Sequence, residues 1–191
     1  MKDRKQSFAL TFGSIGGVAT IVFMLLVYII DHTLVTSFPI LLVEVLITVI
    51  FMVIAVWYER KENGGYITFR PALKTTYGTA VLAWLVFCVF YFSLYKFVDP
   101  ELINVFYKRA AENLVMHGKE LGKSDQEIAN EIARQKGSGL RFDDPKTMFF
   151  LYLFLVILSF FYAMIVSAIA TAASRDNHPN NRIAQQTEEN N

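Results

Sequence analysis

The sequence contains very few of the residues that build disulfide frameworks, metal centres or catalytic groups. Its 191 residues include one cysteine, Cys88, and three histidines. A lone cysteine can form neither an internal disulfide nor a Cys-x-x-Cys site. The histidines are His32, His117 and His178, and their spacing forms no His-Glu-x-x-His or Ser-His-Asp grouping. We therefore predict no cofactor, no metal and no enzyme active site.

One candidate metal site combines a histidine with acidic residues of two predicted outer segments. Asp31 and His32 form a predicted outer loop, and Asp99 and Glu101 follow another predicted membrane segment. Carboxylate and imidazole groups are suitable ligands for a metal ion. A pair of loops of this kind is more often simply solvated, and we do not assign a metal to it.

The chain also lacks an excess of charge of either sign. Eighteen basic and seventeen acidic residues leave a net charge of +1, which argues against nucleic acid as a partner. Hydrophobic residues make up 54% of the chain, and this excludes a disordered protein.

Charge is almost absent from four long stretches, which are Phe8 to Ile30, Phe38 to Tyr58, Thr75 to Tyr95 and Thr147 to Ala173. They contain a single charged residue, Glu44. A helix of about 20 apolar residues crosses the hydrocarbon core of a bilayer, and each stretch reaches that length. The pattern predicts an all-α integral membrane protein with four transmembrane helices in a lipid bilayer.

These stretches divide the whole chain into segments. The predicted transmembrane helices cover 8–30, 38–58, 75–97 and 147–173. The predicted segments between and around them are a basic N-terminus (1–7), a short outer loop (31–37), a cytoplasmic loop with the start of an interfacial helix (59–74), an extracytoplasmic helical hairpin (98–146) and a disordered cytoplasmic tail (174–191).

Lysine and arginine are distributed unequally between the short loops. The N-terminus before residue 8 has three, the loop 31–37 has none, and the segment 59–74 has four. Cytoplasmic loops carry the excess of these residues. We therefore place both termini in the cytoplasm. The first apolar stretch is longer than the core of a cleaved signal peptide, which favours a retained anchor.

Local signals outline the helices of the outer hairpin. Asp99-Pro100-Glu101 is typical of a helix start, and Gly122 can end that helix. Ser124 and Glu127 form a capping box for a second helix. Both helices have a narrow apolar stripe, so we expect them to pack on each other at the membrane surface, with packing on another protein as the alternative.

Glu44 is the candidate polar site inside the membrane. It lies about 9 Å below the outer boundary, where an unpaired carboxylate is costly. Thr48 shares its helical face, Tyr91 and Tyr152 lie at equal depth, and Lys96 is shallow enough to reach down. The group can be a proton or cation relay, or it can tie helices together through tyrosine hydroxyls.

Small residues mark two faces suited to close helix packing. One is in the first transmembrane helix and the other runs along the fourth. We expect these faces to pack on each other within one chain, while a homo-oligomer or another membrane protein remains open. The residues are Gly13, Gly16, Gly17, Ser159, Ala163, Ser167 and Thr171.

Several motifs resemble one bacterial membrane family. They include the first-helix glycines, the segment Gly64-Gly65-Tyr66-Ile67-Thr68-Phe69, Gly78, and Asp99-Pro100-Glu101. Over residues 8 to 173 the chain is similar to the family catalogued as domain of unknown function four-one-nine-nine, found chiefly in Bacteroidota. The resemblance implies a four-helix inner-membrane protein with an outer loop of variable length. It also implies an accessory role in lipid-linked sugar chemistry, because members are encoded near polyprenyl-phosphate glycosyltransferases.

Taken together, these features favour a non-catalytic assembly or accessory component of the bacterial envelope. The small-residue faces and the outer hairpin suit such a role, and it requires no catalytic grouping. A small oligomeric transporter or channel subunit that uses Glu44 is the alternative.

Overall fold

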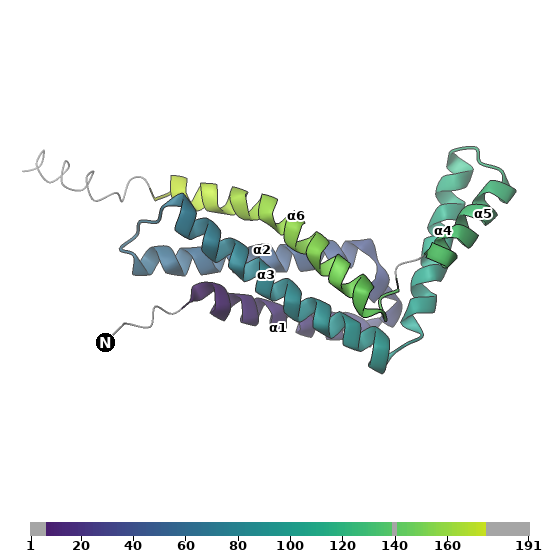
Figure 1. Ribbon diagram of the computed structural model, residues 1–191, viewed down its shortest axis with the longest axis horizontal. Helices are drawn as coiled ribbons and strands as arrows, with labels where there is room; N and C mark the ends of the chain where they lie inside the picture. The colour runs from purple at the N-terminus through teal and green to yellow at the C-terminus, as the bar shows by residue number, and fades with distance from the viewer. Residues whose placement is uncertain (1–6, 139–140, 175–191) are drawn as a thin grey trace, which may run out of the picture.

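The computed structural model describes residues 7–138 and 141–174. These residues form six α-helices, of which four lie side by side as a long bundle (Figure 1). The other two form a hairpin that stands across one end of the bundle (Figure 1). The bounds are α1 Phe8–Ile30, α2 Phe38–Glu62, α3 Phe69–Ser93, α4 Leu102–Glu120, α5 Asp125–Ser138 and α6 Pro145–Ala172.

Helices α1, α2, α3 and α6 are each long and apolar enough to cross a membrane. At most a third of the most apolar window of each is buried within the protein. Many large apolar side chains of these helices are exposed on the outside of the bundle, as expected where lipid is the solvent. This confirms the prediction of an all-helical membrane protein with four transmembrane helices.

The ends of these helices follow local chemistry. The α2–α3 turn uses Gly64 and Gly65 at φ +73° and +88°, a region that favours glycine. Pro145 begins α6 directly after Asp144, since proline is tolerated at the first helical position. Thr68 directly precedes α3, and its side chain makes no capping hydrogen bond. Helix α3 therefore begins six residues before the predicted transmembrane segment, and a π-helical turn over Leu94–Val98 extends it.

Helix α3 is the centre of the bundle, because α1, α2 and α6 all pack on it. Helices α1 and α3 run parallel, with Ala9 opposite Gly78, Gly13 opposite Leu82 and Gly17 opposite Val86. Helix α6 runs antiparallel to α3, and the indole Nε1–H of Trp84 donates to the Tyr162 hydroxyl at 3.0 Å. The core is built around side chains of α3 such as Trp84, Phe87 and Cys88.

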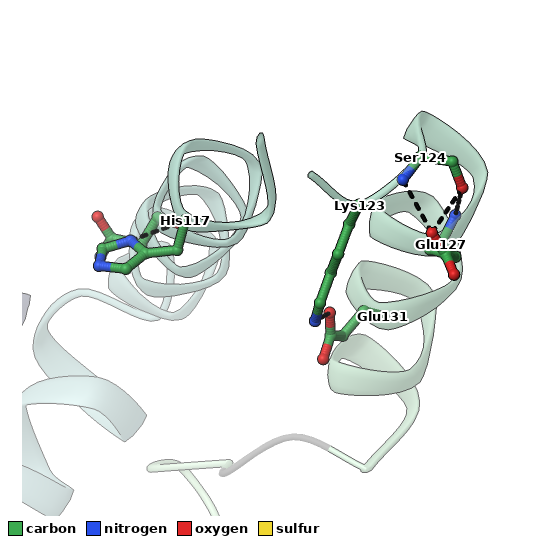
Figure 2. A network of polar contacts seen from close by, with 6 residues as sticks. His117, Lys123, Ser124, Glu127 and Glu131 are labelled. Atoms are coloured by element: carbon green, nitrogen blue, oxygen red, sulfur yellow. Dashed lines mark hydrogen bonds and ion pairs between the residues drawn. The ribbon is translucent and has the colours of Figure 1, made fainter. Parts of the chain in front are cut away.

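The hairpin consists of α4 and α5, which pack on each other. Gly118 lets the helices approach closely, because a Cβ at this position would lie 2.7 Å from Ile128 Cγ1. Gly122, at φ +70°, turns the chain after α4 as predicted. The predicted capping box is also confirmed. The Ser124 N–H donates to Glu127 Oε2 at 2.8 Å, and the Glu127 N–H donates to Ser124 Oγ at 3.3 Å (Figure 2).

The two ends of the described chain lie at the end of the bundle opposite the hairpin (Figure 1). The basic residues Lys2, Arg4 and Lys5, the predicted disordered tail and His178 lie outside the described residues.

Candidate functional site

Glu44 lies in the second turn of α2 and is 1% exposed. Its Oε1 atom is fully buried and has no hydrogen-bond partner among the described residues. Thr48, one turn further along, is fully buried beneath it. The Thr48 hydroxyl donates to the backbone carbonyl of Glu44 at 3.0 Å, so it does not serve the carboxyl group.

A cavity of about 230 Å³ lies beside Glu44. It is enclosed by α2, α3, α6, the 3₁₀ turn His32–Thr36, the first turns of α4 and the residue Phe142 that precedes α6. Its lining is almost entirely apolar apart from the carboxyl group. The lining residues are Val35, Thr36, Ser37, Phe38, Leu41, Glu44, Phe87, Tyr91, Phe106, Phe142, Leu151 and Leu155.

Aromatic rings form much of the cavity wall. Phe87 and Tyr91 are stacked, with ring centroids 5.0 Å apart. Phe106 and Phe142 meet edge to face at 4.9 Å, and Phe142 meets Tyr91 in the same way at 5.8 Å. Offset-stacked and edge-to-face pairs are the preferred arrangements of such rings, so the wall is well packed.

The hydroxyl groups near the cavity are already committed to other acceptors. The Tyr91 O–H donates to the Val35 carbonyl at 3.2 Å, which makes Tyr95 the donor in its 3.3 Å contact with Tyr91. At the mouth, Thr36 and Ser37 donate to carbonyls of their own turn at 2.9 and 2.6 Å. No described hydroxyl donor is therefore left for the Glu44 carboxyl.

The floor of the cavity is closed toward the other end of the bundle. Thr48 and Met52 are 0% exposed, and Trp84 is 1% exposed. Glu44 is therefore at the inner limit of a blind cavity. At the opposite limit Ser37 and Phe38 line the cavity, and the Phe38 side chain is 69% exposed.

Two predicted neighbours of Glu44 are placed elsewhere. Tyr152 is half-buried on α6 and does not line the cavity. Lys96 is exposed and does not reach down to Glu44. Its charge acts instead on Asp143, outside the membrane, whose pKa is lowered by the hydrogen bond from Arg141 and further by Lys96. Of the predicted set, Thr48 and Tyr91 lie beside Glu44. Sequence reasoning missed Phe106 and Phe142, because they come from the hairpin segment.

The glycines of α1 pack on different partners from those predicted. A Cβ at Gly13 would lie 2.9 Å from Leu82 Cβ, and one at Gly17 would lie 2.6 Å from Val86 Cβ. Both partners belong to α3 rather than α6. A Cβ at Gly16 would lie 3.1 Å from Phe51 Cγ of α2. The predicted pairing of the two small-residue faces is therefore wrong, because α3 lies between α1 and α6.

The small residues of α6 also face α3. Ser159, Ala163 and Ser167 are fully buried, while Thr171 is half-buried. Ser167 Oγ lies 2.8 Å from Thr76 Oγ1 of α3. Each hydroxyl also donates to a carbonyl of its own helix, Ser167 to Ala163 at 2.7 Å and Thr76 to Ala72 at 3.0 Å.

Polar contacts fix the outer end of the bundle. Asp31 accepts from the Thr33 N–H at 2.8 Å, and hydrogen bonding from the Thr33 side chain and then from this N–H lowers the pKa of its carboxyl. Arg109 of α4 donates to Thr33 Oγ1 at 2.7 Å, and Tyr28 donates to Asp99 at 3.1 Å. Within the described part of the chain, no three histidine, cysteine, aspartate or glutamate side chains gather in a way that could hold a metal ion.

Comparisons with known proteins identify the family but no individual relative. Neither the curated proteins nor the solved structures gave a match. A family model described as "Protein of unknown function (DUF4199)" matches residues 11–175. This match covers most of the chain, including all four membrane helices and the hairpin. The chain therefore belongs to the DUF4199 family of proteins of unknown function.

Proposed function

We propose that the protein is a non-catalytic assembly or accessory component of the bacterial envelope. In this proposal the four-helix bundle anchors the chain in the inner membrane, and the α4–α5 hairpin docks onto another envelope protein outside the cytoplasm. The observation that supports it is the position of the hairpin, which stands beyond the end of the bundle (Figure 1).

The hairpin is attached to the bundle chiefly through the first half of α4. Helix α4 packs on the 3₁₀ turn, where Arg109 bonds to Thr33. Further along, Met116 is 59% exposed and Leu121 is 75% exposed. Among the described side chains of α5 only Ile128 is buried. Two short helices with so little burial gain stability when a partner covers them.

The hairpin is nevertheless well defined locally. Lys123 pairs with Glu131 at 2.8 Å, and the Ser124–Glu127 capping box fixes the start of α5 (Figure 2). These contacts give the arm a fixed shape before any partner is bound. A preformed arm loses less conformational entropy on binding than a flexible loop would lose.

The proposed orientation supports an outer position for the hairpin. Arg60, Lys61, Arg70 and Lys74 lie near the α2–α3 turn, at the end of the bundle away from the hairpin. Cytoplasmic loops are rich in such residues. Single cysteines at Asn63 and Met116, in a Cys88→Ser background, test this directly. A membrane-impermeant maleimide should label position 116 in intact cells and position 63 only after permeabilisation. The reverse pattern would invert the orientation.

The docking role is tested by crosslinking in living cells. A photoreactive amino acid at Met116 should give one discrete adduct with another envelope protein, identified by mass spectrometry. The same group at Ile157, which is 62% exposed on the membrane-facing side of α6, serves as the control for lipid-exposed positions. Differently tagged copies distinguish a partner from a second copy of the chain. A monomeric native mass and no hairpin adduct would contradict the proposal.

A transporter or channel subunit is the second candidate, and the Glu44 cavity favours it. A conduit needs a path that continues past the carboxyl group toward the cytoplasm. Thr48 and Met52 fill that position and are fully buried. Conduction would therefore require a second conformation or an oligomer. If proton or cation flux is unchanged in a folded Glu44→Gln variant, the transporter or channel function is refuted.

A further inference from the structure

The Glu44 cavity combines an unsatisfied acid with walls that leave room for a ligand. Glu44 is 1% exposed, and its Oε1 atom lacks a partner among the described residues. The hydroxyls of Thr48 and Tyr91 already donate to backbone carbonyls at 3.0 and 3.2 Å. These two hydroxyls therefore donate no hydrogen bond to the carboxyl group.

An ionised carboxylate can only accept hydrogen bonds, and burying it without a partner is costly. It needs either a proton or a positive group beside it. The stacked rings of Phe87 and Tyr91 and the edge-to-face pair of Phe106 and Phe142 add aromatic surface to the same cavity. Aromatic rings attract cations, most strongly where water is excluded. The Glu44 carboxylate and the aromatic walls of the cavity therefore both favour a cationic ligand.

A metal ion suits the cavity poorly. Calcium binds six to eight oxygen ligands, and magnesium retains several waters in an octahedral shell. Here the described lining offers one carboxyl group among apolar side chains, and the hydroxyls of Thr36 and Ser37 donate to their own turn. A cation that carries its own apolar substituents matches such a lining better than a hydrated ion.

We propose that this cavity binds a small hydrophobic monocation, a substituted ammonium whose charge pairs with Glu44 while its apolar groups contact the aromatic wall. The cavity volume of about 230 Å³ equals the liquid volume of about eight water molecules. It is smaller than a typical drug-sized pocket. The ligand enters from the outer end, past the exposed Phe38 side chain. This inference goes beyond the docking role, because it concerns the bundle and requires no partner protein.

Benzyltrimethylammonium is a suitable probe, since it joins one aromatic ring to a compact permanent cation. Neopentylbenzene has the same shape without the charge. The full chain is placed in nanodiscs of zwitterionic phosphatidylcholine, and binding of the radiolabelled cation is measured by equilibrium dialysis, with empty nanodiscs subtracted. We expect saturable binding of one cation per chain. Neopentylbenzene at its aqueous saturation should not displace the cation.

Three variants test the assignment of the site. Glu44→Gln keeps the shape of the side chain and removes its charge, and we expect about ten- to a hundred-fold weaker binding. Leu151→Phe partly fills the cavity while Glu44 is kept, and it should also weaken binding. Glu59→Gln is the matched control. Glu59 also has a buried oxygen without a described partner, but it lies near the other end of α2, so binding should be unchanged.

The midpoint of thermal unfolding in the nanodisc shows whether each variant is folded. If Glu44→Gln fails to fold, Leu151→Phe still tests the cavity. The proposal is overturned if the folded wild-type chain binds no cation saturably. It is also overturned if neopentylbenzene competes equally well, which would indicate a neutral lipid site. Equal loss of binding in Glu59→Gln would likewise refute the assignment to Glu44.

Discussion

Gly17 is the position where α1 approaches α3 most closely, and Gly17→Ala tests how far the bundle depends on that contact. The added Cβ would lie 2.6 Å from Val86 Cβ and 2.8 Å from Val86 Cγ1. Carbon atoms attract each other best at about 3.5 to 4.0 Å. Because Val86 Cβ is attached directly to the backbone, the rotation of a side chain cannot relieve the contact. The two helices must move apart by about 1 Å.

The cost of this separation can be bounded. A radial gap of about 1 Å forfeits up to half of each dispersion contact along the interface, and overpacked cores lose about 1 to 3 kcal/mol. Alanine is better than glycine in a helix by about 0.5 to 1 kcal/mol, which offsets part of the loss. We therefore expect Gly17→Ala to lower the free energy of unfolding by about 1 to 2 kcal/mol.

The assay is equilibrium unfolding in mixed detergent micelles with increasing dodecyl sulfate, followed by circular dichroism. Gly16→Ala is the matched control on the same helix. Its Cβ would lie 3.1 Å from Phe51 Cγ and 3.2 Å from Phe51 Cβ, a milder overlap than the 2.6 Å contact at Gly17, so it should destabilise less. Val86→Gly in the Gly17→Ala background removes the clashing atoms, so the two substitutions should be coupled favourably. Equal stability of wild type and Gly17→Ala, or a larger loss in Gly16→Ala, would refute the reasoning.

Four further predictions concern polar contacts. Ser124→Ala should weaken the start of α5 by about 1 kcal/mol, seen as faster amide hydrogen exchange there, whereas unchanged exchange would contradict the capping role. The pKa of Glu127 is lowered because its carboxylate accepts hydrogen bonds from Ser124. The capping box is therefore intact above the ordinary pKa range of glutamate and should open as the pH falls through the lowered pKa. A titration followed by nuclear magnetic resonance measures this opening. Ser167→Ala removes the contact with Thr76 and should cost about 0.6 kcal/mol in the same unfolding assay. Arg60→Met removes a 2.7 Å bond to Ala173 at the C-terminal end of α6 and a 2.9 Å bond to Gly65, so hydrogen exchange should increase in the last turn of α6 and in the α2–α3 turn, and unchanged exchange at both places would contradict this role.

Much of the fold can be predicted from sequence because each signal is local. The apolar runs predict the membrane helices, and α1 begins and ends at the predicted residues. The Ser124–Glu127 box and Gly122 also act within a few residues. Helix α3 begins before the predicted transmembrane segment because Phe69 to Lys74, the predicted start of an interfacial helix, continue into its apolar portion as one helix. Composition marks the membrane-embedded part of a helix, whereas hydrogen bonding sets its length.

Sequence reasoning fails to predict which membrane helices pack on each other. Gly13 and Gly17 indicate close approach but carry no information about which helix approaches. The missing signal is in α3, where Thr76, Thr79 and Ala80 are all 0% exposed and small. A helix with small residues on several faces is the one best suited to the centre. The candidate site likewise combines a residue that the sequence predicts with residues that it does not. Glu44 stands out by its charge, whereas the ring of Phe142 comes from about 100 residues further along the chain.

The central place of α3 sets an order of events during biosynthesis. The chain is made from its N-terminus, so α1 and α2 enter the membrane before α3 exists. The glycine face of α1 is therefore exposed to lipid until α3, its parallel neighbour, is inserted. Helix α6 follows only after the whole hairpin has been synthesised, and it then closes on a surface of α3 that has stood open. A substitution that delays insertion of α3 would leave α1 and α6 without the helix on which they pack most extensively, and the incomplete bundle would be exposed to quality-control proteases.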